Sequence, residues 1–287
     1  MTIYNFYRYY LQQLQNVYSL QEASIISNWV FESKASIQRH DMISTPGKIL
    51  DEKIIDLLNG ALHQLLQHRP VQYVVGETWF YNLKLKVNEQ VLIPRPETEE
   101  LVQWIIDDYH QPADNKKISI LDIGTGSGCI AIALQKKLAG AIVTATDISN
   151  HALAIAKENA VGNNTTIDFI AVDFLNEAGR GKLPAVDIIV SNPPYIPVNE
   201  KEKLDKNVTG YEPHNALFVP GHLPLLFYEK IVLFSKTHLN RDGKIYVEIH
   251  EAYGEETAAA FSKQFKEVEL KKDLQGKNRM IKATHSL

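Results

Sequence analysis

Four consecutive residues, Asn192, Pro193, Pro194 and Tyr195, have the side chains for a specific chemistry. They directly follow an apolar run at 186–191 that predicts a buried parallel strand. Open α/β sheets bind their ligands at the carboxyl ends of such strands. The side-chain oxygen of Asn192 and the carbonyl of Pro193 can each accept one N–H bond from a planar –NH2 group, and the tyrosine ring can lie against its π system. This Asn-Pro-Pro-Tyr motif predicts methylation of an amide or amino nitrogen.

A glycine-rich turn lies between a strand-like run at 118–123 and a helix-like run at 129–138. Glycine lets a ligand approach the backbone closely, and the N–H groups at the helix start face electron-rich ligand atoms. The G-x-G-x-G spacing differs from the G-x-G-x-x-G of dinucleotide binders, and a P-loop lysine is absent from the sequence here, so a dehydrogenase is disfavoured. This glycine turn comprises Gly124, Thr125, Gly126, Ser127 and Gly128.

Acidic residues mark the ends of three predicted strands. Asp122, just before the glycine turn, suits a ligand that carries an amino group and a sulfonium charge. Asp147 follows the turn by about 20 residues, the position from which an acid binds ribose hydroxyls in doubly wound folds. Asp173 and Phe174 end the third strand, where they can contact and stack on an adenine. On chemistry alone, a strand-ending acid and a core phenylalanine are equally good interpretations of this pair.

The first part of the chain predicts helices and then a hairpin. Apolar residues recur every three or four positions through 1–70, which predicts a small helical domain with its own core. Residues 71–96 then form the linker. We expect a β-hairpin in it, with strands at 79–87 and 91–94 on either side of a turn at 88–90.

From residue 97 to 287 strand-like and helix-like segments alternate, which predicts a mostly parallel sheet with helices on both faces. Pro96 and the acids after it predict the start of a helix. The polar stretch 199–213 is expected to be a mobile loop near the site. Strands are predicted at 118–123, 141–147, 167–173, 186–191, 244–249, 267–270 and 279–283, and helices at 129–138, 151–161, 225–238 and 252–265.

Composition narrows the function classes. A formal charge of -4 and a pI near 6.2 argue against a sequence-independent grip on nucleic acid. The single cysteine, Cys129, excludes an internal disulfide, and the ten histidines are too scattered to predict a metal site. Neither a signal peptide nor a membrane span is predicted from the sequence, so we expect a cytoplasmic protein.

These motifs together resemble class I S-adenosylmethionine-dependent methyltransferases and, more narrowly, the HemK-type release-factor glutamine N5-methyltransferases. The resemblance covers nearly the whole chain. Two stretches depart from the family pattern: 221–225, and His250, which stands where the family usually has glycine. The residues that carry the resemblance are 72–77, 92–99, 122–128, 147–149, 159–160, 191–196, 212–213, 216–217 and 248–249.

The resemblance implies a seven-stranded Rossmann-like methyltransferase sheet, preceded by a small all-helical domain and a hairpin linker. It implies that S-adenosylmethionine contacts the glycine turn, Asp147, Phe174 and Asn192. The Asn-Pro-Pro-Tyr motif would hold the glutamine of the Gly-Gly-Gln loop of class 1 peptide chain release factors. The helical domain would help to dock the factor, and we expect a monomer that binds neither nucleic acid directly nor membrane.

Three alternatives stay open on residue chemistry. A glutamine of a ribosomal protein would need nearly the same motifs. An adenine N6 or guanine N2 methyltransferase would hold its amino group in the same way, but one acting on DNA would need base flipping and a basic recognition surface. A silent donor-binding module would have no need for Asn192 and Tyr195. Arg95, Glu97 and Tyr211 are further candidates for substrate contact, with a structural role equally favoured.

Overall fold

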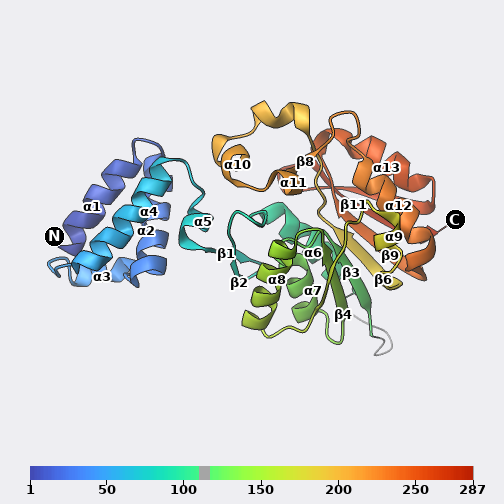
Figure 1. The fold of residues 1–287 in the computed structure, drawn as a ribbon, viewed down its shortest axis with the longest axis horizontal. Helices are drawn as coiled ribbons and strands as arrows, with labels where there is room; N and C mark the ends of the chain where they lie inside the picture. Colours follow the sequence, from blue (N-terminus) through green and yellow to red (C-terminus); the bar gives the residue numbers. More distant parts are fainter. Residues whose placement is uncertain (110–116, 287) are drawn as a thin grey trace. The chain divides into compact units, whose positions relative to one another are not determined.

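The computed structural model describes residues 1–109 and 117–286 and divides into two compact units (Figure 1). The smaller unit comprises Met1–Glu77 together with Leu204–Tyr211. The larger unit comprises Thr78–Lys203 and Glu212–Leu287. A segment that follows the Asn-Pro-Pro-Tyr motif in sequence is therefore part of the amino-terminal unit.

The smaller unit is helical, as the periodicity of 1–70 predicts. Side chains cap its helices: Ser19 and Glu22 form a capping box at α2, and Asp51 accepts the Lys53 amide at α4. Its core is aromatic, and the rings of Tyr10 and Phe31 meet edge to face at 5.2 Å. Its helices are α1 (Ile3–Leu14), α2 (Leu20–Ala35), α3 (Arg39–Ser44), α4 (Glu52–Leu66), α5 (Val71–Val75) and α10 (Lys206–Tyr211).

The hairpin exists, but its predicted turn is wrong. Strands β1 (Glu77–Phe80) and β2 (Leu83–Lys86) both fall inside or beside the first predicted strand, and 91–94 is not a strand. The chain reverses at Tyr81 and Asn82, whose φ angles are 50° and 60°. Two consecutive left-handed residues match the twist of a two-residue hairpin turn. The reversal at Tyr81 was hidden by the aromatic residues around it, which are typical of strands.

The larger unit contains the predicted seven-stranded sheet, in the order β10-β11-β9-β6-β3-β4-β5. Neighbours from β9 to β5 run parallel, whereas β11 runs antiparallel to both β9 and β10. All seven predicted strands are confirmed, although β9 begins five residues earlier than expected. The strands are β3 (Ser119–Ile123), β4 (Ile142–Asp147), β5 (Asp168–Ala171), β6 (Val186–Ser191), β9 (Leu239–Glu248), β10 (Phe265–Lys272) and β11 (Asn278–Ser286).

Helices cover both faces of this sheet (Figure 1). Successive residues of a strand point to opposite faces, so Ile120 packs in one core cluster and Leu121 in the other. The first cluster lies beneath α6 (Pro96–Tyr109), α7 (Cys129–Lys137) and α8 (Asn150–Gly162), and the second beneath α12 (Leu226–His238) and α13 (Gly254–Ser262). The carboxyl ends of the parallel strands are left for the loops that build the site.

Several of those loops contain short elements. The stretch 199–213, expected to be a mobile loop, contains two short helices, η1 (Val198–Lys203) and α10, and its mobility stays a prediction. The backbone carbonyl of Asp205 accepts the amides of Val208 and Thr209 and starts α10. The remaining short elements are α9 (Glu177–Arg180), β7 (Ile196–Pro197), α11 (His214–Leu217), β8 (Phe218–Val219) and η2 (Glu251–Tyr253).

Candidate active site

A cavity of about 340 Å³ lies at the carboxyl ends of the parallel strands, within the larger unit. Its wall joins the glycine turn to the ends of β4 and β6 and to the segment from Asn215 to Phe227. Of the predicted site residues, seven line it: Gly124, Gly126, Asp147, Phe174, Asn192, Pro193 and Pro194. Thr125, Ser127, Gly128 and Tyr195 are not among the residues that line it.

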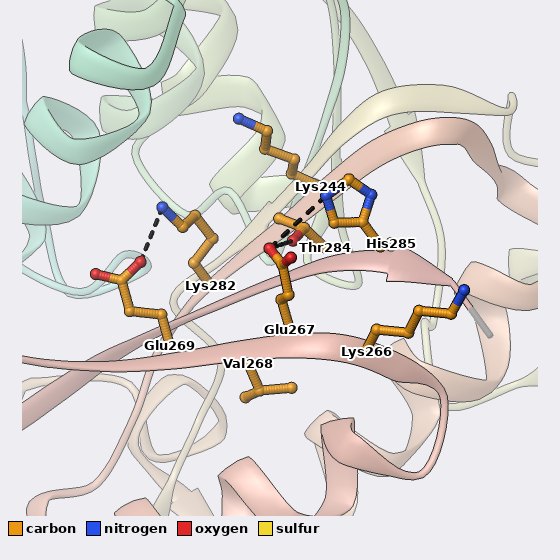
Figure 2. Close-up of a pocket in the computed structure, with 8 residues that line it drawn as sticks. All are labelled: Lys244, Lys266, Glu267, Val268, Glu269, Lys282, Thr284 and His285. Atoms are coloured by element: carbon orange, nitrogen blue, oxygen red, sulfur yellow. Dashed lines mark hydrogen bonds and ion pairs between the residues drawn. The ribbon is translucent and has the colours of Figure 1, made fainter.

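A second hollow, of about 540 Å³, lies against the antiparallel end of the sheet (Figure 2). Lys282 pairs there with Glu269 at 2.9 Å, and Glu267 accepts from Thr284 at 3.2 Å. Charges of both signs compensate one another across β10 and β11. No predicted site residue lines this hollow, so the chemistry belongs to the first cavity.

The three glycines of the glycine turn are all left-handed, with φ angles of 74°, 54° and 82° at Gly124, Gly126 and Gly128. A Cβ atom at either of the first two would meet nothing within 4 Å, so this edge of the backbone is open to the cavity. A Cβ atom at Gly128 would lie 3.1 Å from the Cβ of Ala156. Two glycines therefore expose the backbone to a ligand, and the third lets α7 approach α8.

Asp122 supports the turn from within and does not contact the cavity. Its side chain is fully buried, and its Oδ2 accepts the Thr125 hydroxyl at 2.6 Å. Burial raises the pKa of this carboxyl to about 7. Asp122 is not among the residues that line the cavity, and the expectation that it suits a charged ligand stays a prediction.

Asn159, on α8, joins the hairpin to the glycine turn. Its Nδ2 donates to the carbonyl oxygens of Ser127 at 2.9 Å and Lys86 at 3.0 Å, and its Oδ1 accepts the Lys86 amide. Sequence reasoning had no role for this residue. Its β2 partner is 73 residues away in the chain, and only the fold brings them together.

Asp147 ends β4 and faces the cavity. Its Oδ2 accepts the Gly126 amide and its Oδ1 accepts the Ser149 amide, both at 2.9 Å. Burial raises its pKa above the ordinary value. Each carboxylate oxygen has further lone-pair capacity for ligand hydroxyls. The acid is thus fixed in place before any ligand binds.

Phe174 is both a core residue and a lining residue. Its ring packs edge to face on Phe234 at 5.3 Å while part of it reaches the cavity. Buried Arg180 donates to the Leu175 carbonyl at 3.0 Å and steadies this loop. Asp173 also lines the cavity, and its Oδ1 accepts the Leu175 amide at 3.0 Å.

The Asn-Pro-Pro-Tyr motif is anchored on Glu248, a residue at the end of β9 that is 1% exposed. The Asn192 Nδ2 donates to Thr98 Oγ1 at 3.0 Å, and that hydroxyl donates to Glu248 Oε2 at 2.6 Å. The Tyr195 hydroxyl donates to Glu248 Oε1 at 3.0 Å. Burial raises the pKa of Glu248 and, together with its carboxylate, that of Tyr195. Sequence reasoning assigned no role to Thr98 or Glu248.

The other substrate-contact candidates have intramolecular partners. Arg95 pairs with Glu212, and Glu97 accepts from Gln275 at 3.4 Å. Tyr211 belongs to the helical unit, where its hydroxyl donates to the Gln67 carbonyl at 2.8 Å. These contacts support the structural interpretation of all three.

The departure at His250 has a local explanation. Its Nδ1 accepts the Ala252 amide at 3.1 Å and caps η2, and its ring lies edge-on to Tyr195 at 6.0 Å between centroids. Burial lowers the pKa of this imidazole. With histidine at this position, the Tyr195 hydroxyl donates to Glu248.

The cavity fits S-adenosylmethionine. The open edge at Gly124 and Gly126 accommodates a ligand against the backbone, Asp147 offers acceptors for ribose hydroxyls, and Phe174 offers an aromatic face. In residues 1–109 and 117–286, no group of three or more His, Cys, Asp or Glu side chains is placed to hold a metal ion. Together, the sheet and this site define a class I S-adenosylmethionine-dependent methyltransferase.

Comparison with known proteins narrows the class. The methyltransferase small domain family matches residues 108–209. A release factor glutamine methyltransferase from Flavobacterium psychrophilum is 43% identical over 98% of this chain and 99% of its own length. One from Lactococcus lactis is 45% identical over 81% of this chain and 85% of its own. The chain belongs to the release factor glutamine methyltransferase family.

Solved structures agree on the fold. A methyltransferase from Pyrococcus furiosus matches 71% of this chain and 90% of its own with a TM-score of 0.50 and 16% identity, a likeness that concerns the fold alone. No helix in the described part of the chain is long and apolar enough to cross a membrane.

Proposed function

We propose that this chain transfers a methyl group from S-adenosylmethionine to the side-chain amide nitrogen of the glutamine in the Gly-Gly-Gln loop of peptide chain release factors. The observation that carries this proposal is the shared wall of the cavity. Asn192 and Pro193 line the same space as Gly124, Gly126 and Asp147. An acceptor amide held by the first pair thus lies beside a donor held by the other three.

The motif residues have to overcome the weak nucleophilicity of an amide nitrogen, whose lone pair is delocalised into the carbonyl. The Asn192 Oδ1 and the Pro193 carbonyl oxygen each accept one N–H bond of the acceptor. Both N–H bonds are then fixed, and the free face of the nitrogen points to the cavity. Positioning of this kind supplies up to ~7–11 kcal/mol of a barrier. Pro194 stiffens the turn, and Tyr195, which is not among the lining residues, holds the motif through its hydroxyl bond to Glu248.

The donor supplies an electrophilic methyl group on a sulfonium sulfur. Gly124 and Gly126 offer their open backbone edge to it, Asp147 accepts ribose hydroxyls, and Phe174 lies beside the adenine. Thr125, Ser127 and Gly128 act indirectly, by shaping the turn. As the N–CH3 bond forms, the bond between the methyl carbon and sulfur breaks, the donor leaves as a neutral thioether, and the nitrogen loses one proton to water. A base is not needed for the attack, because that proton becomes acidic only as the N–CH3 bond forms.

The helical unit is the proposed docking surface for the factor, which is a protein substrate many times larger than the cavity. The net charge of -4 favours a protein partner over nucleic acid. We expect the enzyme to act as a monomer in the cytoplasm, where release factors work. The names of the relatives, release factor glutamine methyltransferases, support the choice of substrate.

One incubation with labelled methyl donor tests the proposal. The enzyme is offered a release factor, the factor with its loop glutamine changed to alanine, ribosomal proteins and a DNA duplex. We expect label on the unchanged factor alone. Equal label on the altered factor, or label on the ribosomal proteins or the duplex in its place, would overturn the assignment.

A further inference from the structure

We propose that Thr98 and Glu248 are positioning residues that hold the Asn192 side-chain amide in one orientation, with its oxygen turned to the acceptor. This inference rests on the proposed role of Asn192 in gripping the acceptor amide. A relay of two hydrogen bonds carries it, from Asn192 through Thr98 to Glu248.

The direction of the relay follows from the groups it joins. An ionised carboxylate only accepts, so Glu248 Oε2 takes the single hydroxyl hydrogen of Thr98 at 2.6 Å. Thr98 Oγ1 then has only lone pairs left for Asn192. The side-chain group of Asn192 that meets it at 3.0 Å is therefore the –NH2 group, which donates. The Oδ1 atom is thereby left free, and Asn192 lines the cavity.

A rotated amide would be penalised at this site. If Asn192 turned by 180° about its last bond, Oδ1 would face the oxygen of Thr98, and the –NH2 group would face the –NH2 group of the acceptor. Thr98 could then bond to Asn192 only by turning its hydroxyl hydrogen away from Glu248. The side chain of Glu248 would lose this donor although the residue is only 1% exposed. A buried carboxylate without its donor is costly. The buried Glu248 carboxylate thus determines, through two hydrogen bonds, which end of the Asn192 amide faces the acceptor.

The second oxygen of the same carboxylate fixes the other end of the motif. Glu248 Oε1 accepts the Tyr195 hydroxyl at 3.0 Å, and the Glu248 carbonyl oxygen accepts the Tyr228 hydroxyl at 3.1 Å. Bonds from Thr98 and Tyr195 and the positive charge of Arg279 favour the ionised form of Glu248 and oppose the effect of burial on its pKa. The carboxylate is therefore a common anchor for Asn192 and Tyr195.

A double-mutant cycle tests the relay in the full chain. Thr98→Val keeps the shape of the side chain and removes both hydrogen bonds, whereas Thr98→Ser keeps the hydroxyl. We expect Thr98→Val to lower kcat on the release factor about 10-fold, the scale of one well-placed hydrogen bond. Thr98→Ser should stay within about 2-fold of the unchanged enzyme, and calorimetry should find the donor affinity unchanged in both.

The decisive measurement is the kcat of the double variant that combines Thr98→Val with Asn192→Ala. If Thr98 acts through Asn192, Thr98→Val has no further effect on kcat once the amide is gone. A structural role of Thr98 would instead multiply the two losses, and that result would overturn the relay. So would a loss in Thr98→Ser as large as in Thr98→Val. Thr98→Ala repeats the cycle if the valine variant does not fold.

The controls distinguish failure of the relay from failure of the proposed methyl-transfer function. Normal turnover in Thr98→Val beside an impaired Asn192→Ala would overturn the relay alone. Normal turnover in Asn192→Ala would overturn the gripping role and the relay with it. Absence of methyl transfer by the unchanged enzyme to any glutamine would overturn the proposed activity itself.

Discussion

The guanidinium Nη2 of Arg95 lies 2.5 Å from Oε1 of Glu212, and the two residues are 117 positions apart in the chain. The Glu212 side chain is 1% exposed and that of Arg95 is 34% exposed. Glu212 Oε2 also accepts the Ile93 amide at 3.3 Å. The ion pair thus joins the segment before α6 to the segment that continues into the cavity wall at Asn215.

Loss of this pair should destabilise the larger unit. Arg95→Ala leaves the buried Glu212 carboxylate without its cation. We expect the free energy of unfolding to fall by about 2 kcal/mol. This loss is smaller than the roughly 3–5 kcal/mol for breaking a fully buried pair, because Arg95 is partly exposed to water. Urea denaturation measures it. The control is Lys203→Ala, which removes the exposed pair with Glu200 and should change stability by less than about 0.5 kcal/mol. Equal losses in both variants would contradict the argument.

Removal of the gripping amide should affect the chemical step. We expect Asn192→Ala to lower kcat by on the order of 10²–10³, the scale of losing one well-placed polar group at a reacting centre. The donor contacts at Gly124 and Asp147 are untouched, so the donor affinity should be much less affected than kcat. Steady-state methylation of the factor and calorimetry with the donor measure the two quantities. A turnover close to that of the unchanged enzyme would remove the amide-gripping role.

Asp147 should control donor affinity. Asp147→Ala removes the ribose acceptors and releases the Gly126 amide, so we expect donor binding to weaken by about 1.5–3 kcal/mol. Isothermal calorimetry measures the change. Asp168→Ala, at an exposed acid of β5, is the matched control and should bind the donor normally. Unchanged affinity in Asp147→Ala would contradict the ribose role.

Stability should depend on pH through Asp122. Its pKa rises to about 7 on folding, so the stability it contributes is present below about pH 4 and is lost as the pH rises toward 7. Asp122→Asn does not titrate. As the pH rises from 4 to 7, the free energy of unfolding of the Asp122→Asn variant should therefore increase relative to that of the unchanged protein, by up to about 4 kcal/mol. Denaturation curves at several pH values measure the difference, and parallel pH profiles would exclude the shift.

A glycine pair in the same chain separates packing from helix propensity. Gly128→Ala forces a side chain into a left-handed conformation and against Ala156, and should cost about 1–3 kcal/mol of stability and weaken donor binding. Gly60→Ala, at an exposed position in α4 with open space around it, should stabilise by about 0.5–1 kcal/mol. Thermal unfolding measures both. A stabilised Gly128→Ala variant would refute the packing role.

The five parallel strands of the sheet were predictable because buried parallel strands form continuous apolar runs. The lining role of Asp147 and Asn192 was predictable because Asp147 ends one such strand and Asn192 directly follows another. The hairpin turn was missed because Tyr81 is an unusual residue for a left-handed position. The anchoring roles of Thr98 and Glu248 were missed for another reason. These residues are 150 positions apart, and a hydrogen bond over that separation has no local pattern.

The helical unit recruits α10 from the far side of the Asn-Pro-Pro-Tyr motif, and this has a consequence for truncation experiments. The chain crosses between the units after Glu77, after Lys203 and after Tyr211. Deletion of the first 77 residues would therefore leave α10 without the unit that it belongs to. The Tyr211 hydroxyl, for example, would lose its partner, the Gln67 carbonyl. A truncated enzyme would differ from the whole one in a loop downstream of its catalytic motif as well as in its missing helices. Point substitutions on α1 to α4 are the cleaner way to separate docking from catalysis.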